Sequence, residues 1–346
     1  MPGISASTGR GPRKEARDGV ARVLFLGRPE RRQPWFGALR AALREEDVLE
    51  PYLAERPFAA QLWGVDVVVD PFGAVRLTPP MLAEVAGAGV RLWQVLGVGL
   101  DHLDVPGLLA RDIRLAHMPG ETSARGLAEH ALFLMLCLLK NSRGSQHSIQ
   151  SRTLLLPVNR ELAGRTLLVV GLGASGRAMA ALAQGVGMHV GAVHRVPISA
   201  EERQNLRLAF CGTPEALEEL LPRADVVSLH VPLTAATHRM IGRRQLACMK
   251  PDALLINVSR GAVLDEEALV EALGTGRLGG AGLDVFSREP VAPDHPLLAL
   301  ENVVATPHVA GVTEETAARR ARVAANNVRR LCAGLPLLAE VSGPRA

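Results

Sequence analysis

The sequence lacks the features that mark membrane, extracellular, metal-binding or nucleic-acid-binding proteins. The longest apolar run, residues 131–139, is too short to cross a bilayer. The formal net charge is only +4, and the basic residues are scattered along the chain, which argues against nucleic acid as a partner. The four cysteines are far apart and form no CxxC pair (Cys137, Cys211, Cys248 and Cys332). This spacing predicts reduced, structural thiols, no metal site and a cytoplasmic location.

Residues 1–19 differ from the rest of the chain. They contain the nearest approach to a basic cluster (Arg10, Arg13, Lys14 and Arg17), and they show no apolar period. Because no apolar segment follows the basic residues, we expect no signal peptide here. The segment is predicted to be a flexible leader, with a nucleic-acid-binding arm as the alternative.

From residue 20 onward, short apolar runs alternate with helical patterns. At 346 residues with 48% apolar and 21% charged residues, the chain is expected to fold into two domains. Repeated strand–helix units of this size predict an α/β fold with open parallel sheets and right-handed crossovers. Strands are predicted near residues 20–27, 65–69, 90–96, 166–170, 188–193, 225–230, 253–258, 281–285 and 303–306, and helices near 35–44, 123–140, 177–185, 213–221, 266–273 and 313–331.

A glycine-rich segment, residues 171–176 (GLGASG), follows one of these strands and begins a helix. In this context Gly171 permits a tight turn, Gly173 lets the backbone approach a pyrophosphate, and Gly176 allows close helix–strand packing. The amides at the start of the helix can then bind the anionic phosphates of a dinucleotide. The alternative is a turn that has only a structural role.

The residue type at the end of the next predicted strand, residues 188–193, indicates which of the two nicotinamide cofactors binds. NAD-selective sites place an acidic residue there, which accepts from the ribose 2′-hydroxyl. This chain has His194 and Arg195 instead. A guanidinium can bind a 2′-phosphate, so NADP(H) is favoured and NAD(H) remains the alternative.

Arg260, Glu289 and His308 each follow a predicted strand. The carboxyl ends of parallel strands open onto the ligand crevice, so these side chains are expected to converge there. Arginine can bind a carboxylate, histidine can exchange a proton, and a neighbouring carboxylate orients that histidine. Taken singly, the arginine could cap a helix, the glutamate could be a surface charge, and the histidine could be a satisfied core residue.

Six segments together resemble the D-isomer-specific 2-hydroxyacid dehydrogenases. Many members have an acidic residue at the position of His194, and its replacement here resembles the NADP-preferring branch of glyoxylate and hydroxypyruvate reductases. The resemblance extends from about residue 20 to residue 331. The segments are residues 97–104 (GVGLDHLD), 171–176 (GLGASG), 230–234 (HVPLT), 257–261 (NVSRG), 282–290 (GLDVFSREP) and 306–311 (TPHVAG).

This resemblance implies two Rossmann-like domains with parallel sheets around a central cleft. Residues 20–121 and 313–346 would form the substrate-binding domain, and residues 122–312 the dinucleotide-binding domain. A homodimer through the dinucleotide-binding domain is also implied. The reaction would be hydride transfer between NAD(P)H and a small 2-oxo or 2-hydroxy acid.

The resemblance also implies a role for individual residues. Arg260 would bind the substrate carboxylate and carbonyl, His308 would act as the acid/base, and Glu289 would pair with it. The backbone amides of Val98 and Gly99 would hold the substrate carboxylate from the other domain. The cofactor would contact Gly171, Gly173, Ala174, Ser175, Gly176, His194, Arg195, Val231, Pro232, Thr237, Val258, Asp284 and His308.

Two other functions remain open. The chain could be a nicotinamide-sensing binding protein similar to the corepressors that share this fold, because fold alone does not determine function. It could also be a dehydrogenase of another small anion. The branch of reductases often has a Gly-x-Trp segment where this chain has residues 152–156 (RTLLL), so the resemblance does not define the substrate side-chain pocket.

Overall fold

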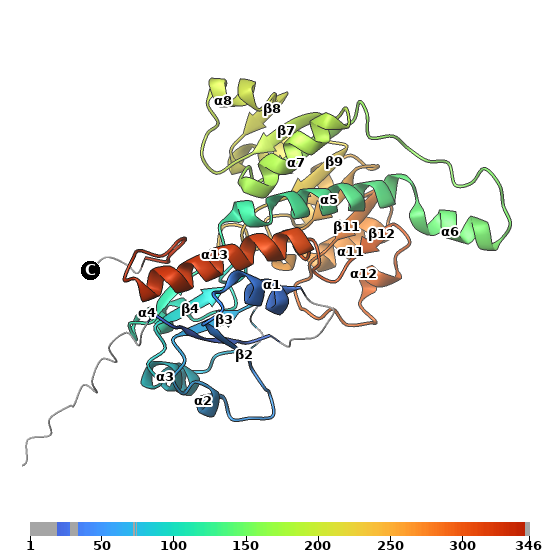
Figure 1. The fold of residues 1–346 in the computed structure, drawn as a ribbon. Helices are drawn as coiled ribbons and strands as arrows, with labels where there is room; N and C mark the ends of the chain where they lie inside the picture. Colours follow the sequence, from blue (N-terminus) through green and yellow to red (C-terminus); the bar gives the residue numbers. More distant parts are fainter. Residues whose placement is uncertain (1–18, 28–33, 72, 74, 343–346) are drawn as a thin grey trace, which may run out of the picture. The chain divides into compact units, whose positions relative to one another are not determined.

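The structure is a computed structural model that describes residues 19–27, 34–71, 73 and 75–342. The chain divides into two compact units, of which unit 1 is Met1–Met118 with Ala317–Ala346 and unit 2 is Pro119–Thr316. In Figure 1, unit 1 runs from blue to cyan and includes most of the red C-terminal helix, and unit 2 runs from green to orange. The predicted leader, residues 1–19, lies outside the described residues except for Gly19.

Unit 1 is built on a parallel sheet. In its described residues five strands pair in the order β2-β1-β3-β4-β5, and each neighbouring pair is parallel. The strands are β1 (Arg22–Phe25), β2 (Val48–Pro51), β3 (Val67–Asp70), β4 (Leu92–Val95) and β5 (Arg114–Ala116). The helices are α1 (Trp35–Ala42), α2 (Phe58–Gln61), α3 (Pro79–Gly87), α4 (Val105–Leu109) and α13 (Glu314–Cys332).

Alternate residues of β1 contribute to two separate hydrophobic cores, one on each face of this sheet. Val23 and Phe25 pack with α1 and α13. Leu24, and Leu26 directly after the strand, pack on the other face with residues of α2, α3 and α4. A strand that is buried on both faces must be apolar throughout, which explains the uninterrupted apolar run in this part of the sequence.

A buried amide pair attaches α13 to the sheet of unit 1. Asn327 of α13 and Gln94 of β4 are both fully buried, and Asn327 Nδ2 donates to Gln94 Oε1 at 2.7 Å. Asn327 Oδ1 also accepts from the backbone N–H of Leu338 at 2.7 Å. The C-terminal segment is therefore part of the same core as β4.

Unit 2 is built on a larger parallel sheet. All residues of unit 2 are described, and seven strands pair in the order β12-β11-β10-β9-β6-β7-β8. This is the doubly wound order, with a switch point between β6 and β9. The strands are β6 (Thr166–Val170), β7 (His189–Val193), β8 (Phe210–Gly212), β9 (Val226–Leu229), β10 (Leu254–Asn257), β11 (Gly280–Leu283) and β12 (Val303–Ala305). The parallel α/β fold expected from the sequence is confirmed.

Helices cover both faces of the sheet in unit 2. The helices are α5 (Ala124–Leu139), α6 (Ser142–Gln150), α7 (Ala174–Gly185), α8 (Ala200–Asn205), α9 (Leu217–Leu220), α10 (Arg243–Cys248), α11 (Glu266–Gly274) and α12 (Pro296–Ala299). Helices α5 and α7 pack on one face, and α9 to α12 pack on the other. A Cβ at Gly282 of β11 would lie 2.8 Å from the Cβ of Leu134, so this glycine lets α5 lie close to the sheet.

One helix of unit 2 is shorter than the sequence pattern predicts. Instead of one helix over residues 213–221, the chain forms the 3₁₀ turn η2 (Pro214–Ala216), the short helix α9 and the 3₁₀ turn η3 (Leu221–Arg223). Pro222 explains why α9 does not continue, because proline has no backbone N–H to donate within a helix, whereas Pro214 is at the first turn, where proline is tolerated. The remaining 3₁₀ turns are η1 (Gly120–Thr122) and η4 (Gly261–Val263).

In the described residues, no helix is both long enough and apolar enough to cross a membrane. No group of three or more His, Cys, Asp or Glu side chains in that part of the chain is arranged to hold a metal ion. All four cysteines are free.

Candidate active site

Arg260, Glu289 and His308 follow three consecutive strands of unit 2. Arg260 comes three residues after β10, Glu289 six residues after β11, and His308 three residues after β12. These strands are neighbours in the sheet and run parallel, so their carboxyl ends lie at the same edge. The sheet therefore brings together the three ionisable residues that the sequence singled out.

His308 and Glu289 form the centre of this group. His308 Nδ1 lies 2.7 Å from Glu289 Oε2. An ionised carboxylate only accepts hydrogen bonds, so Nδ1 carries the proton in this pair. The second ring nitrogen, Nε2, is then the atom that can take up or release a proton in a reaction.

Glu289 is held in its ionised form. Burial on its own would raise its pKa, but hydrogen bonds from His308 and from the backbone N–H of Phe286 oppose this effect, as do the charges of His308 and Arg260. The net result is a pKa of Glu289 below the usual value for a glutamate. A carboxylate beside the imidazole stabilises a positive charge on that ring.

Two neighbours fix the segment that carries Arg260. Asn257, fully buried at the end of β10, donates from Nδ2 to the carbonyl of Arg260 at 2.9 Å and accepts at Oδ1 from the N–H of Ser259 at 3.0 Å. A Cβ at Gly261 would lie 1.8 Å from the carbonyl carbon of Phe286. Glycine at this position therefore lets the arginine segment pack directly against the loop that leads to Glu289.

Asp284 holds the turn that carries His308. Its buried carboxylate accepts hydrogen bonds from the backbone N–H groups of Val309 at 2.9 Å and Ala310 at 2.8 Å, and from Thr306 Oγ1 at 2.6 Å. The N–H of His308 donates to the carbonyl of Asp284 at 2.7 Å. These contacts support His308 in a left-handed backbone conformation, with φ of 55°.

Burial on its own would raise the pKa of Asp284. Hydrogen bonds from His130, Thr306 and the two backbone amides outweigh burial, so its pKa is lowered. Asp284 is therefore a buried carboxylate whose charge is balanced by donors, as a buried ionised group requires.

The glycine-rich turn has the geometry that the sequence predicted. Gly171 has a φ of 98°, which favours glycine, and it directly follows β6. A Cβ at Gly176 would lie 1.9 Å from the carbonyl oxygen of Gly171, so the first turn of α7 packs against β6. A Cβ at Gly173 would meet no heavy atom within 4 Å. There is thus open space at the start of α7, next to the backbone of Ala174 and Ser175.

The neighbouring strands place other candidate residues around this turn. β6 lies between β9 and β7 in the sheet, so their carboxyl ends flank the turn. His194 directly follows β7, and its Nδ1 accepts from the N–H of Leu172 at 3.4 Å. The next residue, Arg195, is exposed.

Beyond β9, a compact turn holds Val231, Pro232 and Thr237. Thr237 Oγ1 donates to the carbonyl of Pro232 at 2.6 Å and accepts from the N–H of Thr234 at 2.8 Å. The structure thus uses the threonine hydroxyl to close the turn. Val258 directly follows β10 and is buried.

Several residues that contribute to this arrangement were assigned no role from the sequence. His230 is buried at the end of β9, where its ring contacts Ser228 Oγ at 3.0 Å and Ser175 Oγ at 3.3 Å. Burial lowers the pKa of His230 to about 4, so the ring is neutral at physiological pH. It connects β9 with the first turn of α7.

His130, Thr306 and Asn257 were also missed. His130 lies on α5 with Nε2 2.8 Å from Thr306 Oγ1, although 176 residues separate them in the sequence. Thr306 and Asn257 stand inside segments that the sequence had already singled out. The sequence feature that could have drawn attention to His130 is its position directly before the apolar run of residues 131–139.

Val98 and Gly99 belong to unit 1. They lie in the loop that follows β4, where Val98 is exposed and Gly99 is partly buried. The carbonyl of Gly97 accepts from the N–H of Met118 at 2.9 Å, which ties the start of this loop to the residue two positions beyond β5.

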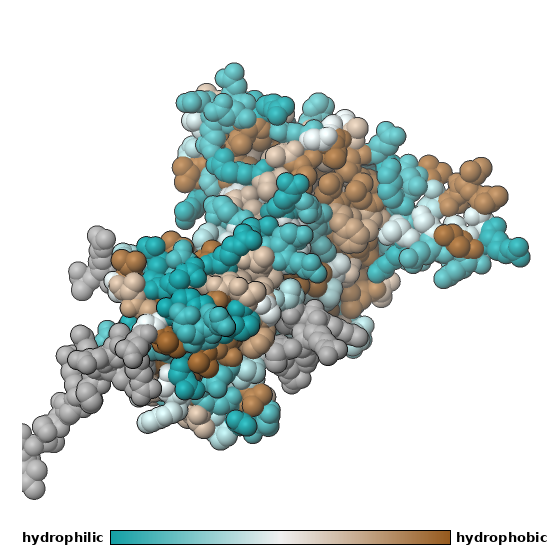
Figure 2. All heavy atoms as spheres, in the orientation of Figure 1, coloured by the Kyte–Doolittle hydropathy of each residue, from teal (hydrophilic) through white to brown (hydrophobic). Residues whose placement is uncertain are grey.

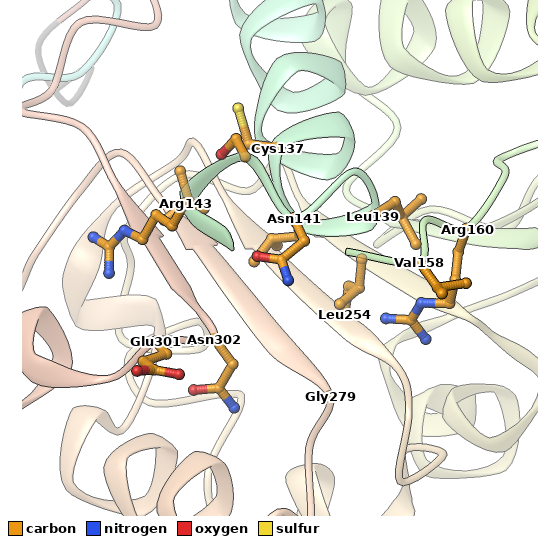
Figure 3. Close-up of a pocket in the computed structure, with 13 residues that line it drawn as sticks. Cys137, Leu139, Asn141, Arg143, Val158, Arg160, Leu254, Gly279, Glu301 and Asn302 are labelled. Carbon is orange, nitrogen blue, oxygen red and sulfur yellow. The ribbon is translucent and has the colours of Figure 1, made fainter. Parts of the chain in front are cut away.

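A cavity of about 350 Å³ in unit 2 lies away from these residues (Figure 3). It is bordered by the end of α5, the start of α6, Val158 and Arg160, and by residues that begin or precede β10, β11 and β12. These strand beginnings are at the edge of the sheet opposite to the carboxyl ends. None of the candidate site residues lines the cavity.

Comparisons with known proteins agree on one family. A family profile described as "D-isomer specific 2-hydroxyacid dehydrogenase, NAD binding domain" matches residues 132–310. The glyoxylate reductase of Korarchaeum cryptofilum is 37% identical over 260 residues, which are 73% of this chain and 76% of that protein. The (S)-sulfolactate dehydrogenase of Chromohalobacter salexigens is 40% identical over 240 residues, covering 68% of this chain and 75% of that protein.

Among solved structures, the chain is similar to the NADPH-dependent glyoxylate/hydroxypyruvate reductase of Sinorhizobium meliloti in complex with NADP and malonate. The identity is 28% and the TM-score 0.77, with 93% of this chain and 97% of that chain covered.

Proposed function

Because this chain belongs to the D-isomer-specific 2-hydroxyacid dehydrogenase family, we propose that it reduces a small 2-oxo acid of the glyoxylate and hydroxypyruvate class with NADPH. The reaction class follows from the family: the chain is an NAD(P)-dependent oxidoreductase that transfers a hydride between a nicotinamide and a 2-oxo or 2-hydroxy acid. The observation that carries the residue assignments is the 2.7 Å contact between His308 and Glu289, beside the strand end that carries Arg260.

Each of these three residues has one task. Arg260 binds the substrate carboxylate and polarises the neighbouring carbonyl through its planar set of donors. His308 donates the proton on Nε2 to the carbonyl oxygen as the carbonyl carbon is reduced to an alcohol carbon, and the ring is left neutral. Glu289 remains ionised, accepts the Nδ1 hydrogen bond and stabilises the positive ring before that transfer. When bound, the dihydronicotinamide supplies the hydride.

The start of α7 fits the pyrophosphate of the cofactor. Open space at Gly173 lets an anion approach the backbone amides of Ala174 and Ser175, and the helix dipole favours negative charge there. We assign unit 2 as the dinucleotide-binding domain for this reason. The remaining proposed cofactor contacts are Gly171, Gly176, His194, Arg195, Val231, Pro232, Thr237, Val258, Asp284 and His308.

Unit 1 is proposed as the substrate-binding domain. It would contribute the backbone amides of Val98 and Gly99, in the loop after β4, to the substrate carboxylate. The carboxyl ends of parallel strands are the usual position for such contacts in open α/β sheets.

The preference for NADPH rests on the residues after β7. No acidic residue stands between Val193 and Ala200, so no carboxylate from this segment would repel a 2′-phosphate. Arg195 is exposed and can bind such a phosphate. The similar structure from Sinorhizobium meliloti is NADPH-dependent by its own description, which supports the same preference here.

A homodimer is proposed through the arm formed by α6 and residues 151–159. The arm projects from the end of α5 in Figure 1, and apolar side chains gather on its outer part in Figure 2. Five of its aliphatic side chains are between 55% and 96% exposed: Ile149, Leu154, Leu155, Leu156 and Val158. Apolar surface of this kind marks an interaction site, and a second copy can bury both arms at once around a two-fold axis.

The proposal is tested by initial rates. Oxidation of NADPH, and separately of NADH, is followed with glyoxylate, with hydroxypyruvate and with a series of bulkier 2-oxo acids. We expect turnover with a small 2-oxo acid and a higher kcat/KM with NADPH. Cofactor binding without turnover on any acid would instead favour the nicotinamide-sensing binding protein.

A second candidate substrate follows from the comparisons. A relative at 40% identity is named (S)-sulfolactate dehydrogenase, so (S)-sulfolactate oxidation with NAD⁺ and NADP⁺ belongs in the same series. Turnover of the sulfonate alone, without any rate on glyoxylate or hydroxypyruvate, would move the substrate class to that anion.

A further inference from the structure

His130 contacts Thr306 and Asp284, which hold the turn that carries His308. It stands on α5, is largely buried, and has Nε2 2.8 Å from Thr306 Oγ1 and 3.4 Å from Asp284 Oδ1. Neither His130 nor Thr306 takes part in the reaction as proposed above. Both nevertheless contact Asp284, and Asp284 in turn binds the backbone of the candidate acid/base residue and of the two residues that follow it.

The directions of these hydrogen bonds follow from the atoms involved. The single hydroxyl hydrogen of Thr306 is donated to Asp284 Oδ1 at 2.6 Å. The hydroxyl oxygen can then only accept from His130, so His130 Nε2 carries a hydrogen. The result is a directed chain from His130 to Thr306 to Asp284.

This chain ends on the backbone of the turn. Asp284 accepts from the N–H groups of Val309 and Ala310, and its own carbonyl accepts from the N–H of His308. His308 has a φ of 55°, a conformation that a residue with a Cβ adopts only where its surroundings hold it. If the carboxylate could rotate, it would release the two amides that flank the histidine on its C-terminal side.

We propose that His130 is a positioning residue: through Thr306 it fixes the Asp284 carboxylate, and thereby holds His308 in the geometry needed for proton transfer. The inference depends on the proposed role of His308 as the acid/base. It differs from a merely structural role, in which His130 would only attach α5 to the sheet and its loss would reduce stability without changing the rate per folded molecule.

The test replaces the hydrogen-bond donor at this position. His130→Leu removes it, and His130→Gln retains an amide N–H at a similar reach. His189→Leu is the matched control, because His189 is an exposed histidine at the start of β7, at the opposite edge of the sheet. All variants are assayed as the full chain, with kcat expressed per NADPH-binding site so that unfolded protein is not counted.

We expect His130→Leu to lower kcat by about 10- to 100-fold, because a displacement on the order of 1 Å at the reacting groups has effects of this size. The dissociation constant for NADPH, from fluorescence titration, should change by less than about threefold, since Asp284 and His308 are only two of the proposed cofactor contacts and the cradle for the phosphates is elsewhere. His130→Gln should restore most of the rate. The kinetic isotope effect with NADPH deuterated at the transferred position should increase in His130→Leu, as the chemical step becomes slower relative to product release.

A second pair of variants acts on the same chain of hydrogen bonds. Thr306→Val should reproduce the loss, and Thr306→Ser should not. The double variant with His130→Leu and Thr306→Val should be slowed by less than the product of the two single effects, because both variants remove the hydrogen bond between His130 and Thr306.

The outcomes separate this inference from the proposed function. If His308→Ala loses turnover while His130→Leu keeps the wild-type kcat and isotope effect, the positioning role is wrong and the function stands. If the rate of His130→Leu falls only with the NADPH-binding fraction, or if His130→Gln is as slow as His130→Leu, the positioning role is also overturned. If His308→Ala keeps full turnover, the acid/base role on which this inference depends fails. If the wild-type protein binds NADPH but reduces no 2-oxo acid, the proposed function itself fails.

Discussion

The substitution Gly261→Ala tests whether the close packing of two loops assembles the site. A Cβ on residue 261 would lie 1.8 Å from the carbonyl carbon of Phe286, 2.2 Å from its oxygen and 2.2 Å from the nitrogen of Ser287. All three are backbone atoms, so no side-chain rotation can relieve the overlap. Either the arginine segment or the loop that leads to Glu289 must move.

The required movement can be worked out from these distances. Ordinary van der Waals contact begins at 3.4 Å, so the nearest atom must recede by about 1.6 Å from its present 1.8 Å. Such overpacking costs about 1 to 3 kcal/mol of stability. Misplacing the arginine relative to the histidine–glutamate pair by about 1 Å is expected to lower kcat/KM by about 100-fold. The affinity for NADPH should be nearly unchanged, because the glycine-rich turn is on another loop.

Initial rates with the best 2-oxo acid, thermal unfolding and NADPH titration check this expectation. Gly274→Ala is the matched control: Gly274 ends helix α11, and a Cβ there would meet no heavy atom within 4 Å. The control should keep the wild-type kcat/KM. A Gly261→Ala variant that is folded, binds NADPH and retains full kcat/KM would refute the view that this packing positions Arg260.

Four further outcomes are expected. His308→Ala should lower kcat by about 100- to 10,000-fold with little change in NADPH affinity, because it removes proton transfer but leaves the phosphate cradle and most proposed cofactor contacts in place. Arg195→Ala should raise KM for NADPH more than for NADH, and equal effects on both would contradict a contact with the 2′-phosphate. Asp284→Asn should reduce the free energy of unfolding most above pH 4. Because the folded pKa of Asp284 is lowered, that difference should shrink as the pH falls below 3.8 and through the folded pKa, which denaturant unfolding at several pH values can measure. Replacing Leu154 and Leu155 by serine should shift the protein from dimer to monomer in sedimentation velocity, whereas Leu335→Ser, an exposed leucine of unit 1, should not.

The sequence predicted every central strand and one edge strand, β12, and missed the other three edge strands. β2, β5 and β8 each have one neighbour in their sheet. β2 alternates between exposed and partly buried residues and ends in a proline, so it lacks the continuous apolar run that identified the central strands. An edge strand is defined by pairing on one side only, and that pairing depends on the rest of the sheet.

The same distinction applies to the site. Arg260, Glu289 and His308 could be found from the sequence because each stands a few residues beyond a buried strand. His130 could not, because its contact with Thr306 joins residues 176 positions apart, and nothing local in an apolar helix indicates which face meets β12. The left-handed backbone conformation of His308 could not be predicted from the sequence either, since it is imposed by hydrogen bonds to Asp284.

Beyond the ends of the strands, side-chain oxygens accept hydrogen bonds from backbone N–H groups that no neighbouring strand pairs. Asn257 accepts from the N–H of Ser259, Asp284 from those of Val309 and Ala310, and the carboxylate of Glu289 from that of Phe286. Beyond the last ladder pair, each of these segments would otherwise be a loop with unpaired amides and freedom to move. Because buried or half-buried oxygen acceptors hold these amides, the loops keep the rigidity of the strands that precede them. The side chains proposed to react can therefore stand outside the sheet and still be preorganised for the proposed reaction.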